Sequence, residues 1–145
     1  MKNRLIQQIH ENFITYLEKI LEHTHEYEYR KRRYKVEYTI ALYIAKESID
    51  SEYIRKHVRD TDKLVVLDSN LVAMIFDFAD EEAGFKAAEN ILSFIEPKLS
   101  NDEIYISVVN SKDAIDVDEH IRKALNLLME NIESGFRDIP EYPIF

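Results

Sequence analysis

The order of strand-like and helix-like segments in the middle of the chain is the feature that most restricts its fold. Runs rich in β-branched and aromatic residues predict four strands, at 36–45, 63–67, 71–78 and 103–109. Apolar residues spaced three and four apart predict two helices between them, at 51–58 and 80–95. The turn-forming trio Asp68-Ser69-Asn70 joins the two middle strands into a hairpin. This order is that of a ferredoxin-like α+β sandwich, a four-stranded antiparallel sheet with helices on one face.

Two further helices are predicted outside this core. An amphipathic helix extends from Leu5 to about His25, and the charged stretch 26–35 follows it. A final helix extends from Val117 to Glu133 and ends at Gly135, a residue suited to a left-handed cap. We therefore expect one domain, composed of an N-terminal helix (1–25), the ferredoxin-like core (36–135) and an extended tail that contains two prolines (136–145).

The composition excludes several classes of protein. The 145 residues include no cysteine, which excludes disulfides, thiolate metal sites and cysteine nucleophiles. Only two glycines occur, Gly84 and Gly135, so a glycine-rich phosphate-binding loop is absent. No apolar run approaches the roughly 20 residues that a membrane helix needs, and the first residues lack the apolar core of a signal peptide. We therefore expect a cytoplasmic protein without membrane contact.

The formal net charge of −9 argues against nonspecific binding to nucleic acid. A local exception is a basic cluster with tyrosines interleaved, composed of Tyr27, Tyr29, Arg30, Lys31, Arg32, Arg33, Tyr34 and Lys35. Two interpretations of this cluster are open: a surface for nucleic acid or a protein partner, and a solvated helix end or linker. The histidine pair His23 and His25 does not have the spacing of a metal site, because residues two apart on a helix point in different directions.

Two short strings carry a resemblance to a known family. Arg59-Asp60-Thr61-Asp62 is followed, after five residues, by Asp68-Ser69-Asn70-Leu71-Val72 and then by an apolar strand. This arrangement resembles that of GGDEF (diguanylate cyclase) domains, in which an RxxD motif precedes the signature hairpin by five residues. The segments Ile104–Val108 and Asp116–Gly135 resemble the strand and the closing helix of the same family. In this resemblance Asp68, Ser69, Asn70, Leu71 and Val72 occupy the signature positions, and the fold expected is again ferredoxin-like.

The departures from the family pattern imply that the site is degenerate. Active cyclases hold two divalent cations through carboxylates of the first strand and the hairpin, and such cations need oxygen ligands. Here the first-strand acidic positions fall near Tyr43 and Ala45, and the signature's acidic pair is replaced by Asn70 and Leu71. Only the segment 46–58 fills the space in which the family carries its guanine-binding helices. We therefore expect a bacterial signalling protein that is not an enzyme, with no catalytic residues, no metal and no cofactor.

The leading functional hypothesis is a regulatory or protein-interaction module, whose first helix pairs with a partner protein or with a second copy, or packs on its own domain. The second hypothesis is a receptor that binds cyclic di-GMP through Arg59 and Asp62, since arginine pairs bidentately with phosphate and guanine edges. A purely local ion pair between Arg59 and Asp62 is also consistent with the motif. The sequence is further compatible with an active nucleotide cyclase that has an aberrant signature, and with an unrelated ferredoxin-like domain.

Overall fold

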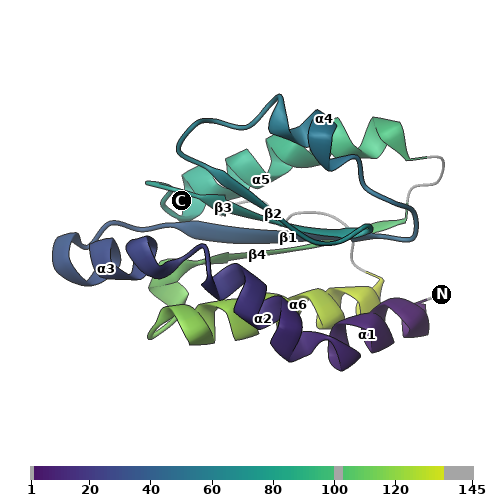
Figure 1. The fold of residues 1–145 in the computed structure, drawn as a ribbon, viewed down its shortest axis with the longest axis horizontal. Helices are drawn as coiled ribbons and strands as arrows, with labels where there is room; N and C mark the ends of the chain where they lie inside the picture. Colours follow the sequence, from purple (N-terminus) through teal and green to yellow (C-terminus); the bar gives the residue numbers. More distant parts are fainter. Residues whose placement is uncertain (1, 100–102, 136–145) are drawn as a thin grey trace.

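A four-stranded antiparallel sheet forms the centre of the molecule (Figure 1). The computed structural model describes residues 2–99 and 103–135. The strand order is β2-β3-β1-β4, and every neighbouring pair is antiparallel. The strands are β1 (Thr39–Ala45), β2 (Lys63–Asp68), β3 (Leu71–Phe76) and β4 (Ile104–Asn110). This order confirms the predicted ferredoxin-like fold.

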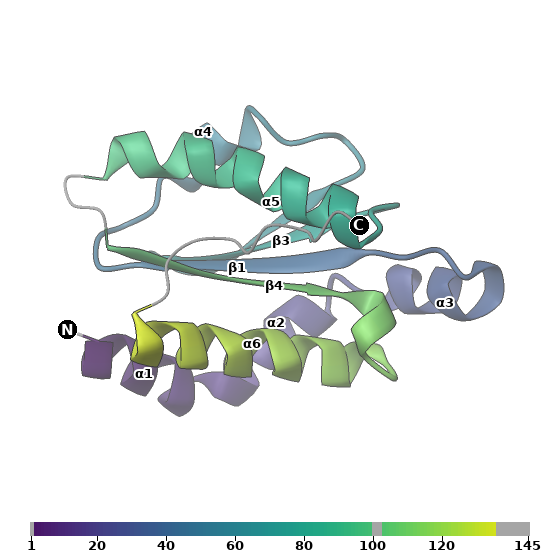
Figure 2. The same ribbon diagram turned by 180° about the vertical axis from the view of Figure 1, so that it is seen from behind.

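Helices cover both faces of the sheet because the central strands are apolar on both sides. On one face, Ala41, Tyr43 and Ala45 of β1 pack beneath α4 (Ser51–Arg55) and α5 (Glu81–Ile95). On the other face, Ile40 and Leu42 pack against the remaining long helices (Figures 1 and 2). These helices are α1 (Lys2–Glu11), α2 (Phe13–Leu21) and α6 (Val117–Ser134). The two core helices share one face as predicted, and the added helices close the other.

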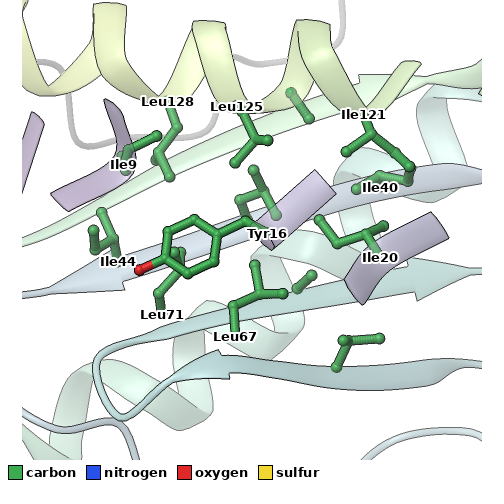
Figure 3. Packing of buried hydrophobic residues seen from close by; sticks show 14 of the residues in the cluster. Ile9, Tyr16, Ile20, Ile40, Ile44, Leu67, Leu71, Ile121, Leu125 and Leu128 are labelled. Carbon is green, nitrogen blue, oxygen red and sulfur yellow. The ribbon is translucent and has the colours of Figure 1, made fainter. Parts of the chain in front are cut away.

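The single helix predicted for the N-terminal segment is two helices. α1 and α2 are separated at Asn12, whose side-chain amide donates to the carbonyl of Gln8 at 2.8 Å. Both helices direct their apolar residues toward the sheet and α6 (Figure 3); the buried ones are Leu5, Ile9, Tyr16, Leu17 and Ile20. Of the arrangements considered for this segment, the structure therefore has the one in which its apolar stripe packs on its own domain.

The charged stretch after α2 is also a helix, α3 (His25–Tyr34), which the sequence pattern did not indicate. Acidic side chains in its first turn and basic ones in its last turn complement the helix dipole, and Lys35 ends it in a left-handed conformation with φ of 56°. Only Tyr27 on this helix is buried. An amphipathic pattern is therefore missing, which is why apolar periodicity gave no signal.

The remaining element ends follow from local chemistry. The N-cap residues Asp80 and Asp116 accept hydrogen bonds from the backbone amides of Ala83 (2.8 Å) and Glu119 (2.9 Å). Gly135 caps α6 with φ of 76°, as predicted. The helix predicted at 51–58 ends earlier, at Arg55, and short 3-10 turns follow α5 (Glu96–Lys98) and β4 (Ser111–Asp113). Residues 136–145, predicted to be an extended tail, lie outside the described residues.

Candidate functional site

The hairpin between β2 and β3 places the five signature positions at one end of the sheet. Ser69 and Asn70 form the turn, and their carbonyls accept hydrogen bonds from the amides of Ile49 (2.8 Å) and Ala45 (3.0 Å). Leu71 and Val72 begin β3 with fully buried side chains, one on each face of the sheet. A leucine and a valine offer no oxygen or nitrogen ligand, so the hairpin presents polar side chains only from Asp68 to Asn70.

Two of these side chains, Asp68 and Asn70, bind the chain's own N-terminal helices. Gln8 and Asn70 exchange two amide hydrogen bonds, of 2.8 and 3.0 Å, and Asn70 also donates to the carbonyl of Ala45 at 3.0 Å. The hydroxyl of Tyr16 donates to Asp68 at 3.1 Å. Burial, together with the nearby Asp68 carboxylate, raises the pKa of Tyr16, so this phenol keeps its proton at neutral pH. We call these contacts among Gln8, Tyr16, Asp68 and Asn70 the hairpin clamp.

The first-strand positions that the resemblance singled out lie in the core beneath α5. Tyr43 is fully buried, and its hydroxyl donates to the carbonyl of Ala88 at 2.7 Å. Burial raises the pKa of Tyr43 far above its ordinary value, so no phenolate forms there. Ala45 is also buried and has no polar side-chain atom. Within residues 2–99 and 103–135, no group of three or more histidine, aspartate or glutamate side chains is arranged to hold a metal ion.

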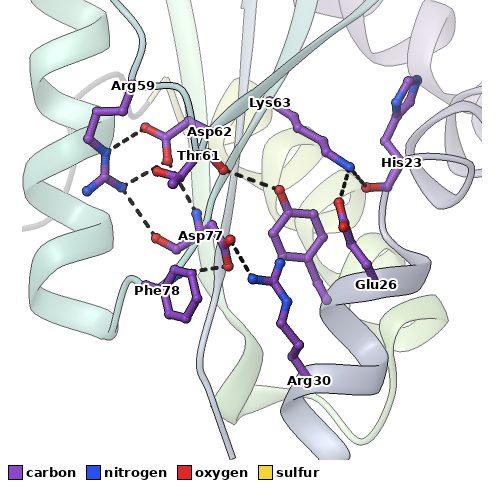
Figure 4. A network of polar contacts seen from close by, with 10 residues as sticks. His23, Glu26, Arg30, Arg59, Thr61, Asp62, Lys63, Asp77 and Phe78 are labelled. Carbon is purple, nitrogen blue, oxygen red and sulfur yellow. Dashed lines mark hydrogen bonds and ion pairs between the residues drawn. The ribbon is translucent and has the colours of Figure 1, made fainter. Parts of the chain in front are cut away.

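The RxxD pair lies at the opposite end of β2 from the hairpin. Arg59 Nε and Nη2 each donate to one carboxylate oxygen of Asp62 at 2.9 Å, a bidentate ion pair (Figure 4). The Arg59 side chain is 59% exposed, whereas the Asp62 side chain is 4% exposed. The hydrogen bonds with Asp62 raise the pKa of Arg59 above its ordinary value. The structure therefore brings Arg59 and Asp62 together as a local ion pair. This is one of the two interpretations of the motif given above, the other being a binding site for cyclic di-GMP.

Asp77, which follows β3, connects the RxxD pair to α3. Its backbone amide donates to Asp62 at 3.3 Å, and its side chain accepts from Arg30 at 2.7 Å (Figure 4). The Arg30 guanidinium lies 4.8 Å from the ring centre of Tyr27 and 5.0 Å from that of Phe78. Sequence reasoning did not single out Phe78, Gln8 or Tyr16, because their contacts join segments far apart in the chain.

Two surface hollows flank Arg59. One, of about 390 Å³, is lined by basic side chains that include Arg55, Arg59 and Lys63, with Asp60 and Asp62 beside them. The other, of about 400 Å³, has an apolar and aromatic lining beside Arg59 and Asp62, formed by His57, Val58, Phe76, Ala87, Ile91 and Phe94, with Asn90 at its edge. Lys63 is already bound to Glu26 and to the carbonyl of His23 (3.2 Å). Arg59 is therefore the basic residue that both hollows share.

Solved structures of GGDEF domains share this fold. The diguanylate cyclase SiaD of Pseudomonas aeruginosa, solved with its activator SiaC, has a TM-score of 0.59 at 10% identity, over 94% of this chain and 67% of that one. The GGDEF domain of DgcB from Caulobacter crescentus, solved with cyclic di-GMP, has a TM-score of 0.59 at 12% identity, over 75% of this chain and 78% of that one. An EAL/GGDEF domain protein of M. capsulatus gives a TM-score of 0.53 at 14% identity, over 71% and 82%.

The chain therefore has a GGDEF-like fold, as the resemblance predicted. No family model matches its sequence, and no curated protein matches it either. In the part of the chain that the structure describes, no helix is both long and apolar enough to cross a membrane.

Proposed function

We propose that this chain is a non-catalytic GGDEF-like domain that acts as a regulatory or protein-interaction module in signalling. The observation that carries the proposal is the hairpin clamp. The side chains of Asp68 and Asn70 in the signature turn bind Tyr16 and Gln8 of the chain's own helices. Phosphoryl transfer needs polar groups that are free to hold substrate and metal, and in this hairpin Asp68 and Asn70 already bind other groups of the chain.

The first strand supports the same conclusion. Divalent cations that neutralise a triphosphate need carboxylate or carbonyl oxygens around them. At the corresponding positions the chain has a buried phenol whose proton is donated to Ala88, and the methyl group of Ala45. Neither can replace a carboxylate ligand.

Turnover of GTP by the purified full chain tests the proposal. We expect no cyclic dinucleotide from GTP with Mg²⁺ or Mn²⁺, measured by chromatography and mass spectrometry, with an active diguanylate cyclase run in parallel as the positive control. Steady product formation that increases with the concentration of this chain would overturn the proposal.

The exposed guanidinium of Arg59 favours a second candidate, a receptor for cyclic di-GMP. The Nη1 atom of Arg59 has no hydrogen-bond partner in the described residues, and the side chain lies between a basic and an apolar hollow. A ligand with phosphates and planar bases matches that combination of surfaces. Because Asp62 already accepts two hydrogen bonds from Arg59, such a ligand would have to bind the free edge of the guanidinium or displace the carboxylate.

Isothermal titration with cyclic di-GMP tests the receptor candidate. Arg122 provides a matched control, because it is also a surface arginine paired within one helix turn, to Asp118 at 2.6 Å. If the chain is a receptor, Arg59→Ala abolishes the heat of binding and Arg122→Ala leaves it unchanged. An absence of heat with the unmodified chain, or equal loss in both variants, would rule out this use of the RxxD pair.

A further inference from the structure

The helix α3 buries only one of its ten residues in the domain. It lies at one end of the molecule, beyond the helices that cover the sheet (Figures 1 and 2). Tyr27 is its only buried residue, although Arg30 and Lys31 also reach back to the domain through Asp77 and the carbonyls of Ser111 and Ala114. The side chains of Tyr29, Arg32, Arg33 and Tyr34 are exposed, so packing within the domain does not explain them.

Exposed aromatic side chains gather around this helix. Among the described residues, five large hydrophobic side chains are exposed, and three of them lie on α3 or against it. These are Tyr29 (59%), Tyr34 (62%) and Phe78 (62%). Tyr29 and Tyr34 also contact each other edge to face, with ring centres 6.4 Å apart. Aromatic residues are enriched at protein interfaces because they bury a large area with little loss of conformational freedom.

Phe78 is held in its exposed position by the backbone and by Arg30. Its φ of 53° lies in the left-handed region, which is unfavourable for a bulky side chain. Asp77 binds Arg30 at 2.7 Å (Figure 4), and the Arg30 guanidinium lies 5.0 Å from the ring centre of Phe78. The ring is therefore presented at the surface by a network that extends to Arg59 and Asp62.

Unpaired positive charge accompanies these rings. Arg32, Arg33 and Lys35 are exposed, and none of them has a carboxylate within ion-pair distance in the described residues. This charge stands out in a chain whose net charge is −9. The helix dipole favours cations in the last turn, but it does not account for aromatic rings exposed beside them.

We infer that Tyr29, Arg32, Arg33, Tyr34, Lys35 and Phe78, the α3 surface, bind an acidic segment of a partner protein that also carries apolar side chains. The inference rests on the proposed role as an interaction module and specifies the surface and the chemistry of the partner. Complementary charge selects and orients such a segment, and the rings contact its apolar side chains. Nucleic acid is disfavoured because the whole chain is acidic and Glu26 and Glu28 occupy the start of the same helix.

Fluorescence anisotropy with a labelled probe tests this inference on the full chain. The probe is a short peptide of alternating aspartate or glutamate with leucine and phenylalanine. A peptide with asparagine and glutamine in place of the acids, and a single-stranded oligonucleotide, are measured beside it.

Three variants of the α3 surface are compared with one control. The charge variant combines Arg32→Glu with Arg33→Glu, and the aromatic variants are Tyr34→Ala and Phe78→Ala. The control for the charge variant combines Lys19→Glu with Lys56→Glu, two exposed lysines elsewhere that make the same change in net charge. Circular dichroism of each variant establishes that it is folded.

We expect the acidic peptide to bind more tightly than both of the comparison probes, and the charge variant to weaken binding by about tenfold or more. The aromatic variants should also weaken binding, while the lysine control leaves it unchanged. Tighter binding of the oligonucleotide, an equal loss in the lysine control, or full binding by both aromatic variants would overturn the inference. GTP turnover is measured in a separate experiment. If the peptide does not bind, the α3 inference fails, while the proposal of a non-catalytic domain is still decided by the turnover result.

Discussion

Gln8 and Asn70 lie 62 positions apart in the chain and exchange two amide hydrogen bonds, of 2.8 and 3.0 Å. This contact joins α1 to the turn that occupies the signature positions of the GGDEF-like fold. Both amide groups are partly buried. The hydrogen bonds between them therefore replace hydrogen bonds that the amides make with water in the unfolded chain. The N-terminal helices and the hairpin are therefore one structural unit.

Removing the Asn70 amide should destabilise the fold. Asn70→Ala removes both bonds to Gln8 and the bond to the Ala45 carbonyl, and we expect a loss of about 1–3 kcal/mol in the free energy of unfolding. Urea denaturation followed by circular dichroism measures it. Gln7→Ala, on the exposed side of α1, should change stability by less than about 0.5 kcal/mol.

A double-mutant cycle separates the clamp from the general effect of each substitution. If Gln8 and Asn70 act together, the destabilisations by Gln8→Ala and Asn70→Ala should deviate from additivity by about 0.5 kcal/mol or more. Additive effects would mean that the amide pair contributes nothing as a pair.

The buried histidine of α6 should make stability depend on acid. His120 is completely buried between β4 and α6, and one ring nitrogen is 2.6 Å from the Val109 carbonyl. Burial lowers the pKa of His120 to about 4, and the nearby Lys31 and Lys123 act in the same direction. In the unfolded chain the pKa is near its ordinary value of about 6.5. Between these values the unfolded state binds more protons, so stability rises with pH.

We therefore expect the free energy of unfolding to fall as the pH drops from about 6.5 to 4, by on the order of 3 kcal/mol from this residue. His120→Leu should be less stable at neutral pH but should lose this part of the pH dependence, whereas the exposed His10→Gln should retain it. Urea denaturation at a series of pH values gives the profiles. Parallel pH profiles for the unmodified chain and His120→Leu would contradict the assignment.

The elements that could be predicted from sequence are those whose pattern is set by burial. In β1, Ile40 and Leu42 face one layer while Ala41 and Tyr43 face the other, and this two-sided burial gives the continuous apolar run of a central strand. Helix α5 was predicted with nearly its observed bounds because its buried residues recur with helical spacing.

The candidate sites could be predicted only in part, for reasons that are also physical. Arg59 and Asp62 are three residues apart, so their pairing is a local property of the chain. The partners of Asn70 and Asp77 come from α1 and α3, and no local pattern specifies which side chains two distant elements bring together. Helix α3 was missed because terminal charges and a single buried tyrosine support it.

Gly84 should not tolerate alanine, although it lies in a helix. An alanine Cβ at this position would lie 2.1 Å from the Thr39 hydroxyl oxygen and 2.6 Å from its Cβ. Thr39 cannot move freely, because its hydroxyl donates to the Ala79 carbonyl (3.2 Å) and accepts from Asn110 (3.0 Å). In a solvent-exposed helix, Gly→Ala stabilises by about 1 kcal/mol.

We expect the opposite sign for Gly84→Ala, a destabilisation of about 1–3 kcal/mol through overpacking between α5 and β1. Thermal and urea unfolding measure it, with Glu89→Ala on the exposed side of α5 as a variant that should remain near the original stability. Stabilisation of the chain by Gly84→Ala would show that α5 does not approach β1 this closely.

Introducing an acid at the first strand should unfold the domain rather than create a metal site. Tyr43→Asp places a carboxylate where a phenol is fully buried, and the hydrogen-bond partner found there, the Ala88 carbonyl, is itself an acceptor. A buried charge without a partner costs several kcal/mol, and the smaller side chain also leaves a cavity beneath α5. Tyr43→Phe, which removes only the hydroxyl, should cost about 1 kcal/mol.

Urea midpoints of Tyr43→Asp and Tyr43→Phe give the comparison, and GTP turnover is measured on each. A stable Tyr43→Asp domain that forms cyclic dinucleotide with Mg²⁺ would show that the site is open to metal after all. A loss of stability several times larger than that of Tyr43→Phe would show that the first-strand position now belongs to the core. Recovery of activity would then require rebuilding the packing around Tyr43, because a ligand alone cannot be placed where the sheet and α5 leave no room for solvent.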